Sequence, residues 1–127
     1  MYVAIVSSDE KRAKQLGDNI LDICMSRGCY STFLCYTADE DFERALDERE
    51  FNTVIITATD EAERRTAKMV ADKKPKVKLI LLGSAEMAVE GYTLHADYCS
   101  AADPQEEDMR RIVEIIFPIE RMKTYDN

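Results

Sequence analysis

The sequence predicts an α/β protein: a five-stranded parallel sheet in the order 2-1-3-4-5 with helices on both faces. Five short apolar segments alternate with segments of helical pattern along the 127 residues, and this alternation is typical of a parallel sheet. The segments 54–56 and 79–82 are apolar without a break, as in strands covered on both faces. Right-handed crossovers leave this strand order as the natural one for a chain of this length.

A strand, a helix and a second strand are expected first. Residues 2–6 and 31–36 are rich in β-branched and aromatic side chains, which favour strands. Between them, apolar residues recur every three or four positions, which is typical of one face of a helix. Ser8 or Asp9 can cap the start of this helix, and Gly28 can adopt the left-handed conformation that ends it.

The middle of the chain predicts two helices around a buried strand. Thr37 and Glu40 have the spacing of a capping box and open a short helix. Residues 52–57 form the next strand, which we expect to be central. A weakly patterned helix follows over about 59–73, and Pro75 prevents its continuation.

The next three elements are short. Residues 77–82 predict a fourth strand, since they are apolar apart from one lysine. Residues 85–90 are expected to form a helix that Gly91 closes. Residues 96–100 predict the fifth strand.

The last predicted element is an amphipathic helix. Asp103 is expected to cap it, with Pro104 at its first helical position and Pro118 at its end. We find no internal repeat and no linker, so we expect one domain over residues 1–122 and a frayed tail over 123–127.

The charge of the chain limits its partners. Its formal net charge is −8 and its pI is about 4.7, and an acidic surface repels phosphate backbones, so no direct nucleic-acid binding is expected. One basic cluster, Lys73, Lys74, Lys76 and Lys78, flanks Pro75. Its simplest interpretation is a solvated helix end, where lysines are favoured.

Neither a membrane segment nor a catalytic motif is recognisable. No apolar run approaches eighteen residues and the start lacks a basic signal segment, so we expect a cytoplasmic protein without membrane contact. The four cysteines match no zinc ribbon, and the one histidine, His95, cannot complete a usual site. A Ser–His–Asp triad using His95 is less favoured than a histidine in packing or an exposed loop. No cofactor and no enzyme activity are predicted.

Ligands of such sheets bind outside the carboxyl ends of the strands. That edge is predicted to gather residues 7–9, 57–60, 83–84 and 100–102, which follow or end the first, third, fourth and fifth strands. The site must be sought among them.

The chain as a whole resembles a response-regulator receiver domain, which has the CheY-like, flavodoxin-like fold. The residues over 88–98, AVEGYTLHADY, are similar to the LytTR-type subfamily, and AIVSSD over 4–9 resembles its first strand and acidic turn. The resemblance spans roughly residues 2–117. It implies two-component signal transduction, in which a phosphorelay transfers a phosphoryl group to an aspartate with help from Mg²⁺, a hydroxyl residue and a lysine.

The residues at those positions depart from the pattern. Serines replace the acidic pair, a threonine the acceptor aspartate, a glycine or the following serine the hydroxyl residue, and an alanine the lysine. These positions are Ser7, Ser8, Thr57, Gly83, Ser84 and Ala101. Mg²⁺ prefers carboxylates, and four losses at one charge-stabilising site cannot be compensated together. We therefore predict a degenerate receiver, or pseudo-receiver, without aspartyl phosphorylation or a metal.

Two other arrangements stay open at this point. Asp9 and Asp60 could meet across the edge, hold a cation and form a relocated phosphoaccepting site, although both positions also suit acids in the first turn of a helix. Ser7, Ser8, Thr57 and Ser84 could form a neutral pocket for a small molecule. They could instead bond to one another and fill the vacated site.

The resemblance also implies a contact surface on the last two helices and the last strand. Tyr98 falls at the receivers' switch aromatic, and the surface implies protein partners and a homodimer. We expect Met87, Val89, Tyr92 and Ile115 on this surface, with Arg110, Arg111 and Glu114 at its rim. Met87, Val89 and Ile115 could instead cover the core. LytTR-type proteins carry a DNA-binding domain after the receiver, so the chain is either stand-alone or the N-terminal part of a transcriptional regulator.

Overall fold

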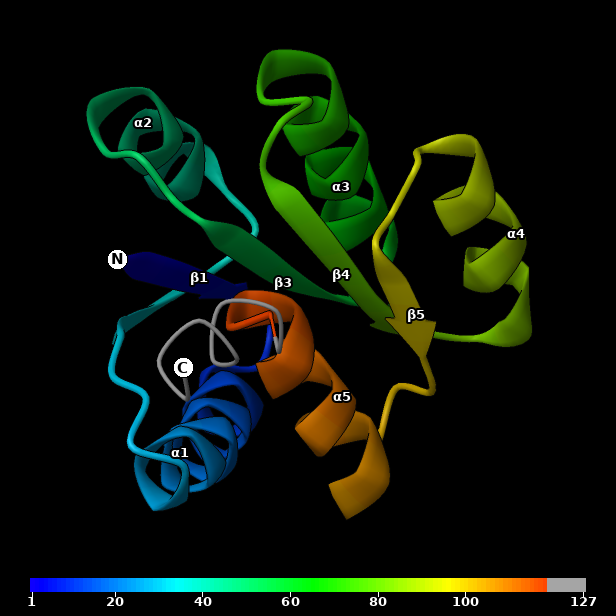
Figure 1. Ribbon diagram of the computed structural model, residues 1–127. Helices are drawn as coiled ribbons and strands as arrows, with labels where there is room; N and C mark the ends of the chain where they lie inside the picture. Colours follow the sequence, from blue (N-terminus) through cyan, green and yellow to red (C-terminus); the bar gives the residue numbers. More distant parts are fainter. Residues whose placement is uncertain (119–127) are drawn as a thin grey trace.

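The computed structural model describes residues 1–118, except the side chains of residues 85 and 86. The predicted tail, 123–127, and the end of the predicted domain, 119–122, lie outside the described residues. Figure 1 shows ten elements in strict alternation. They are β1 (Tyr2–Val6), α1 (Glu10–Ser26), β2 (Thr32–Tyr36), α2 (Glu40–Glu48), β3 (Thr53–Ala58), α3 (Glu61–Lys73), β4 (Lys78–Gly83), α4 (Ala85–Thr93), β5 (Tyr98–Ser100) and α5 (Glu106–Ile116).

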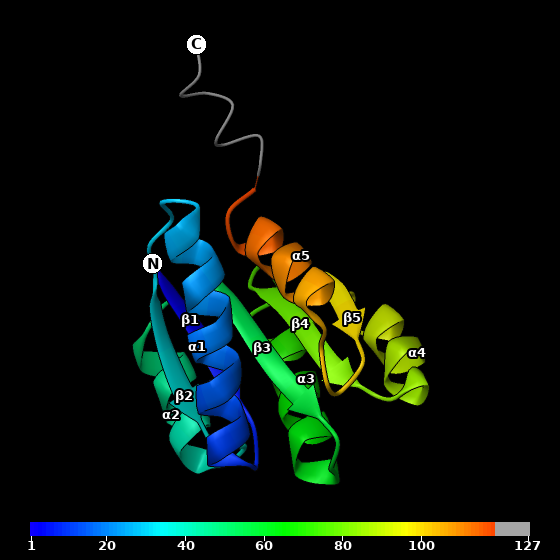
Figure 2. The ribbon, with the colours of Figure 1, turned by 90° about the horizontal axis from the view of Figure 1, so that it is seen from below.

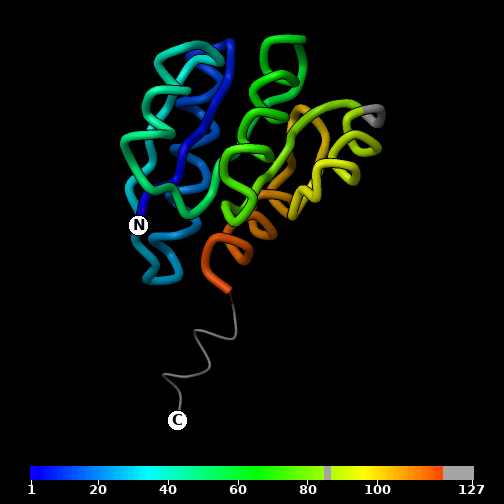
Figure 3. The backbone as a smooth tube through the Cα atoms, turned by 90° about the horizontal axis from the view of Figure 1, so that it is seen from above, coloured from blue at the N-terminus to red at the C-terminus, as the bar shows by residue number. Residues whose placement is uncertain are grey.

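The five strands form one parallel sheet in the order β2-β1-β3-β4-β5, which confirms the predicted fold. Helices α1 and α5 cover one face, and α2, α3 and α4 cover the other (Figure 2). The tube in Figure 3 shows α1, α2, β1 and β2 gathered at one side of the molecule and α4 with β5 at the other. No helix in residues 1–118 is long and apolar enough to cross a membrane.

Strand β3 is the centre of the molecule, because all six of its residues are buried. Along it, Val54 and Ile56 join the core beneath α2, α3 and α4, while Ile55 joins the core beneath α1 and α5. Successive strand residues point to opposite faces, so the unbroken apolar run supplies both cores at once.

Helix α1 begins and ends as predicted. The Asp9 carboxylate accepts hydrogen bonds from the backbone N–H groups of Lys11, at 3.1 Å, and Arg12, at 3.3 Å. At the other end Gly28 has a φ of 71°, and the Cys29 N–H donates to the Cys24 carbonyl at 2.8 Å. This six-to-one bond satisfies a carbonyl that the helix end leaves open.

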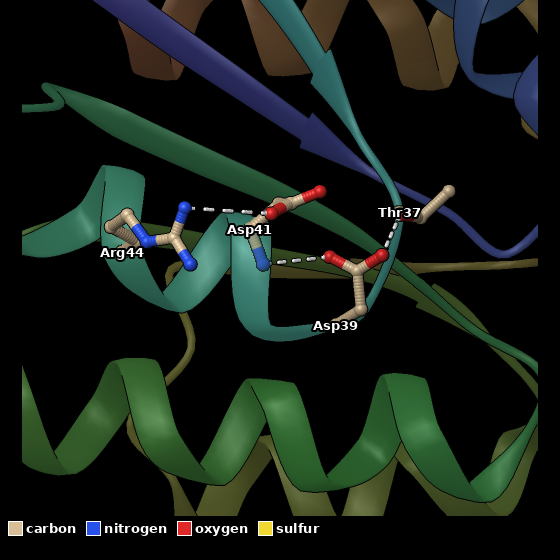
Figure 4. Close-up of polar contacts among 4 residues, drawn as sticks. All are labelled: Thr37, Asp39, Asp41 and Arg44. Carbon is tan, nitrogen blue, oxygen red and sulfur yellow. Dashed lines mark hydrogen bonds and ion pairs between the residues drawn. The ribbon is translucent and has the colours of Figure 1, made fainter.

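Helix α2 begins differently from the prediction. Its N-cap is Asp39 rather than Thr37, and one carboxylate oxygen of Asp39 accepts from the Asp41 N–H at 3.0 Å (Figure 4). The Thr37 hydroxyl donates to the other oxygen, and this bond holds the pKa of Asp39 below its usual value. The threonine therefore supports the cap instead of forming it.

Helix α4 continues beyond Gly91, so the predicted stop is wrong. A Cβ at Gly91 would meet the Cys99 Sγ and lie 3.3 Å from a Leu81 methyl group. The glycine thus permits close packing of α4 on the sheet. His95 takes the left-handed conformation in its place, with a φ of 59°, and the Ala96 N–H donates to the Gly91 carbonyl at 2.9 Å.

The last strand and helix are shorter than predicted. Strand β5 begins at Tyr98, and α5 begins at Glu106 with Gln105 as its N-cap, so Asp103 and Pro104 lie in the preceding connection. The Gln105 N–H donates to Asp108 Oδ2 at 2.9 Å. Asp108, three residues after the cap, holds the helix start that the proline was expected to mark.

Candidate functional site

The topology brings the predicted site residues to the carboxyl edge of the sheet. Strand β1 leads into Ser7, β3 contains Thr57, β4 ends at Gly83, and β5 is followed by Ala101. In the sheet, Val6 pairs with Ile56, and Ala58 with Gly83, so the ends of β1, β3 and β4 are adjacent. This part of the prediction follows from the strand order alone.

The side chain of Glu63, which is not among the predicted site residues, fills this edge. Glu63 is 1% exposed, and its carboxylate accepts five hydrogen bonds. One oxygen accepts from the Ser8 N–H at 3.0 Å and from the Thr57 hydroxyl. The other accepts from the Thr59 N–H at 2.9 Å, the Thr59 hydroxyl at 2.8 Å and the Asp60 N–H at 3.1 Å. All five contacts are donated to the carboxylate by N–H or O–H groups.

The start of α3 explains how Glu63 reaches this position. Only Thr59 and Asp60 separate β3 from α3, so the first helical turn lies against the sheet edge. Asp60 caps the helix by accepting from the Glu63 N–H at 2.8 Å, and Glu63 returns the contact by accepting from the Asp60 N–H. This is a complete capping box. The positive end of the helix dipole also favours a carboxylate there.

Ser8 joins the end of β1 to the start of α3. Besides the N–H bond to Glu63, its hydroxyl donates to Asp60 Oδ2 at 2.6 Å. This hydroxyl is the main reason that the pKa of Asp60 lies below its usual value, with the Glu63 N–H as a further donor. Ser8 therefore presents two donors to carboxylates at the place where the receiver pattern would bind Mg²⁺.

Asp9 and Asp60, for which a shared cation site was left open, have separate roles. Asp9 caps α1 and Asp60 caps α3, each one residue before the first helical turn in which the simpler interpretation placed it. Over residues 1–118, with the side chains of 85 and 86 excepted, no three His, Cys, Asp or Glu side chains are grouped to hold a metal ion.

The hydroxyl groups of Ser7, Ser8 and Thr57 at the edge bond to carboxylates or backbone groups and not to one another. The buried Ser7 hydroxyl accepts from the Asp9 N–H at 3.2 Å, Ser8 donates to Asp60, and Thr57 donates to Glu63. Ser84 lies apart as the exposed N-cap of α4. Carboxylates and backbone groups fill the edge, where the sequence analysis expected hydroxyl–hydroxyl contacts.

Gly83 has no room for a side chain. A Cβ there would lie 2.8 Å from the Ala58 carbonyl oxygen and 3.1 Å from the Met87 Cγ. The hydroxyl residue of the receiver pattern would therefore require a backbone shift at this position. Ala101, at the lysine position, is exposed and has only a methyl group to offer.

The sequence does contain a signal for Glu63. Asp60 and Glu63 have the Asp-x-x-Glu spacing of a capping box, the same pattern that the sequence analysis recognised at Thr37. Capping boxes normally lie at the surface. The burial of this one depends on the two-residue connection before α3, which becomes significant only once the strand order is known.

Tyr98 is held by α5. Its hydroxyl donates to Asp108 Oδ1 at 2.9 Å, while its ring packs against the core beneath α1 and α5. Burial, followed by the Asp108 contact, raises the pKa of Tyr98. The Gln105 N–H and then Tyr98 lower the pKa of Asp108. The tyrosine thus joins β5 to the first turn of α5.

The predicted contact surface is only partly exposed. Met87 is 2% exposed and belongs to the core, which was the alternative to a place on the surface, while Val89 and Tyr92 on α4 are 72% and 86% exposed. Ile115 is half-buried, and its carbonyl accepts from the Lys78 Nζ at 2.7 Å.

Charged pairs lie on α5 at the rim of the predicted contact surface. Arg110 pairs with Glu106 at 2.7 Å, and Arg111 with Glu114 at 3.6 Å.

His95 is exposed, and within the described part of the chain no hydrogen bond joins its ring to a serine or an aspartate. The triad alternative thus has no geometric support in these residues.

No protein-family model and no curated protein sequence matches the chain. Solved structures of response regulators do match. DrrB, an OmpR/PhoB homologue from Thermotoga maritima, superposes with a TM-score of 0.65 at 18% identity over 99% of this chain and 54% of its own. The BeF3-activated DrrB receiver domain superposes with a TM-score of 0.63 at 23% identity, over 91% of this chain and 96% of its own. The response regulatory domain of MrkE from Klebsiella pneumoniae superposes with a TM-score of 0.68 at 16% identity, over 99% of this chain and 98% of its own.

These similarities show that the chain has the CheY-like fold of receiver domains. The chain spans about half the length of DrrB, 54%. The LytTR-type resemblance stays a prediction.

Proposed function

We propose that this protein is a pseudo-receiver: a two-component-type signalling module that acts through protein contacts and is not switched by aspartyl phosphorylation. The observation that carries the proposal is the buried Glu63 carboxylate, which occupies the edge of the sheet where the receiver pattern places its phosphorylation chemistry. The receiver fold supports the signalling role, and the contents of the edge support the loss of the reaction.

Electrostatics supports the absence of phosphorylation. A phosphoryl group carries about −1.5 to −2 charges at neutral pH. Two like unit charges about 4 Å apart repel by roughly 4 kcal/mol at an effective dielectric constant of about 20. Glu63 already brings one carboxylate to the edge, and none of its five hydrogen-bond donors belongs to a lysine or an arginine. A second anion there would be strongly disfavoured.

Thr57 is also poorly placed to accept a phosphoryl group itself. A hydroxyl that donates to a carboxylate can act as an activated nucleophile, and Thr57 makes this contact with Glu63. However, Thr57 is 1% exposed, so a phosphodonor has no path to its oxygen without opening of the edge. The contact therefore supports a structural role.

The contact surface of the proposed module is the α4–β5–α5 face, through which we expect a homodimer or another protein partner. Tyr92 and Val89 are the most exposed large apolar side chains among the described residues of α4. Exposed aromatic and apolar groups with a charged rim are typical of interfaces. The bond between Tyr98 and Asp108 holds the strand and helix of this face in one arrangement.

The test is to add beryllofluoride, a phosphoryl analogue, together with Mg²⁺ and to record two-dimensional amide NMR spectra. We expect no saturable shifts at Ser8, Thr57 or Ala101, because the edge is already filled by an anion. The DrrB receiver domain, which is known in a BeF3-activated form, is the positive control, and Mg²⁺ alone is the blank. Saturable shifts that require both reagents would contradict the proposal and indicate a relocated acceptor such as Asp60.

A further inference from the structure

A groove lies at the amino-terminal edge of the sheet, opposite the edge that Glu63 fills. We call it the amino-edge groove; Leu46, Phe51 and Val77 form its floor, and Arg49, Lys74 and Lys76 stand at its rim. Its volume is about 470 Å³. It lies between the connection from α2 to β3 and the connection from α3 to β4, which the Lys78 N–H joins by donating to the Asn52 carbonyl at 3.1 Å.

The floor of the groove is apolar and firmly packed. Leu46 is 1% exposed and Phe51 is 7% exposed. The Phe51 ring lies 6.0 Å from the Tyr36 ring and 6.3 Å from the Phe42 ring, in an aromatic cluster of the core. Aromatic pairs at such separations are favourable, so the groove is a preformed hollow on a rigid base.

The rim is cationic although the protein is acidic. Four of the groove's side chains are cationic and one, Glu50, is acidic, in a chain with a formal net charge of −8. Lys73 is occupied by α2, with its Nζ 3.0 Å from a Glu43 oxygen and 3.8 Å from an Asp47 oxygen. The Arg49 guanidinium lies over the Tyr2 ring, 4.5 Å from its centre, and this contact fixes it beside the groove.

Lys74 and Lys76 provide the charge that is left for a ligand. In the part of the chain that the structure describes, neither makes an ion pair with an acidic side chain. The end of α3 explains a lysine at 74 through the helix dipole. The helix dipole does not explain Lys76, which lies beyond the helix. It also does not explain why an apolar floor lies between Arg49 and the two lysines.

We propose that the amino-edge groove binds an acidic peptide segment of a protein partner, with one bulky apolar side chain on the floor and flanking carboxylates at Arg49, Lys74 and Lys76. Charge complementarity selects this partner, because the groove is a positive region on a negative molecule. A nucleic acid would extend its phosphates over the surrounding acidic surface, whereas a short acidic peptide need only contact the groove. The proposal is independent of the edge that Glu63 fills.

The probe is a fluorescein-labelled synthetic eight-residue peptide in which one Phe and one Leu stand among Asp and Glu residues. Anisotropy should show saturable binding that weakens with salt, and amide NMR shifts should centre on Phe51, Lys74 and Val77. The double variant Lys74→Glu/Lys76→Glu should weaken binding by tenfold or more, as expected for charge-assisted contacts. Replacing the peptide's Phe and Leu by Ser should weaken binding to the unaltered protein.

The matched control is Lys11→Glu/Lys14→Glu on the exposed side of α1, which changes the net charge equally and should leave binding intact. An equal loss in both double variants would mean general charge attraction and would overturn the proposal. So would an absence of saturation, or shifts centred away from the groove. Groove-dependent binding of a DNA oligonucleotide or an anionic vesicle in preference to the peptide would assign the surface to another class of partner.

Discussion

Glu63 accepts hydrogen bonds from residues in or directly after two strands, β1 and β3. One of these donors, Ser8, is 55 positions away in the sequence. A buried carboxylate without a cation is normally costly. Here five donors and the start of α3 compensate its charge. Glu63 therefore has a buried structural role, although residues of capping boxes normally lie at the surface.

Replacing the Glu63 carboxylate by an uncharged amide should reveal its structural role. We expect Glu63→Gln to lower the free energy of unfolding by about 2–4 kcal/mol, because the amide NH₂ faces donors and leaves buried groups unpaired. Urea denaturation measures the change. Glu61→Gln, two residues away at an exposed position, should change stability by no more than about 0.5 kcal/mol. Similar effects of the two substitutions would contradict the structural role of Glu63.

The Ser8 hydroxyl should control the titration of Asp60. Its bond lowers the pKa of Asp60, so Ser8→Ala should raise that pKa toward the usual value. A lowered pKa in the folded state adds stability above the unfolded pKa, and this stability is lost as the pH falls through the folded pKa. The variant should therefore lose less stability on acidification. Carboxyl ¹³C NMR measures the pKa, and Ser84→Ala, which makes no cap bond, should leave it unchanged.

At the scale of elements, the strands were easier to predict than the helix ends. The runs that became β3 and β4 are apolar because both faces of the sheet are covered, and this pattern is visible locally. The ends of α2 and α4 depend on competition between neighbours. Asp39 displaces Thr37 as a cap, and Gly91 serves contact with the sheet instead of ending a helix. A choice between two nearby capping residues decides the first case, and a tertiary contact with Cys99 decides the second.

The candidate site shows the same division. The sheet edge could be predicted, because strand order alone brings Ser8, Thr57 and Gly83 together. What fills the edge could not, because Glu63 becomes a buried partner only through the short connection between β3 and α3. The spacing of Asp60 and Glu63 was visible in the sequence, but its burial was not.

The packing of α4 on β5 gives a prediction at this scale. A glycine-to-alanine change inside a helix normally stabilises by about 0.5–1 kcal/mol. We expect Gly91→Ala to destabilise instead, by about 1–3 kcal/mol, because its Cβ meets the Cys99 Sγ. Thermal or urea unfolding measures the change. Combining it with Cys99→Ala should relieve the overlap, so the substitution should cost less in that background. An equal cost in both backgrounds would place the strain elsewhere.

At the scale of the whole molecule, the two candidate contact surfaces, the amino-edge groove and the α4–β5–α5 face, lie in different places. The amino-edge groove is lined by residues that precede β3 and β4. Helix α4, which carries the exposed Val89 and Tyr92, lies on the other side of the molecule from α2 (Figure 3). A partner in the groove would thus leave the α4–β5–α5 face free. One protein could hold two contacts at once, as expected of a module that works by binding.

The oligomeric state tests the second surface. If the α4–β5–α5 face forms a homodimer, Tyr92→Ser should shift sedimentation velocity profiles toward the monomer over a concentration series, because exposed aromatics anchor interfaces. Tyr30→Ser removes an aromatic side chain that is also well exposed, at 72%, but lies outside this face, between α1 and β2. It should leave the profiles unchanged. A purely monomeric parent protein, or equal effects of the two variants, would rule out a homodimer through this face.

The contacts of Glu63 also bear on how this chain could change over evolutionary time. Placing an aspartate at Thr57 as a first step would press two carboxylates together in a buried place. Removing Glu63 first would leave several buried donors without an acceptor. Either order would lower stability, and the carbonyl beside Gly83 leaves no room for a third residue of the receiver pattern. For the proposed pseudo-receiver, the filled edge would therefore oppose the gain of phosphoryl chemistry by single substitutions, while substitutions on the surface would remain open to it.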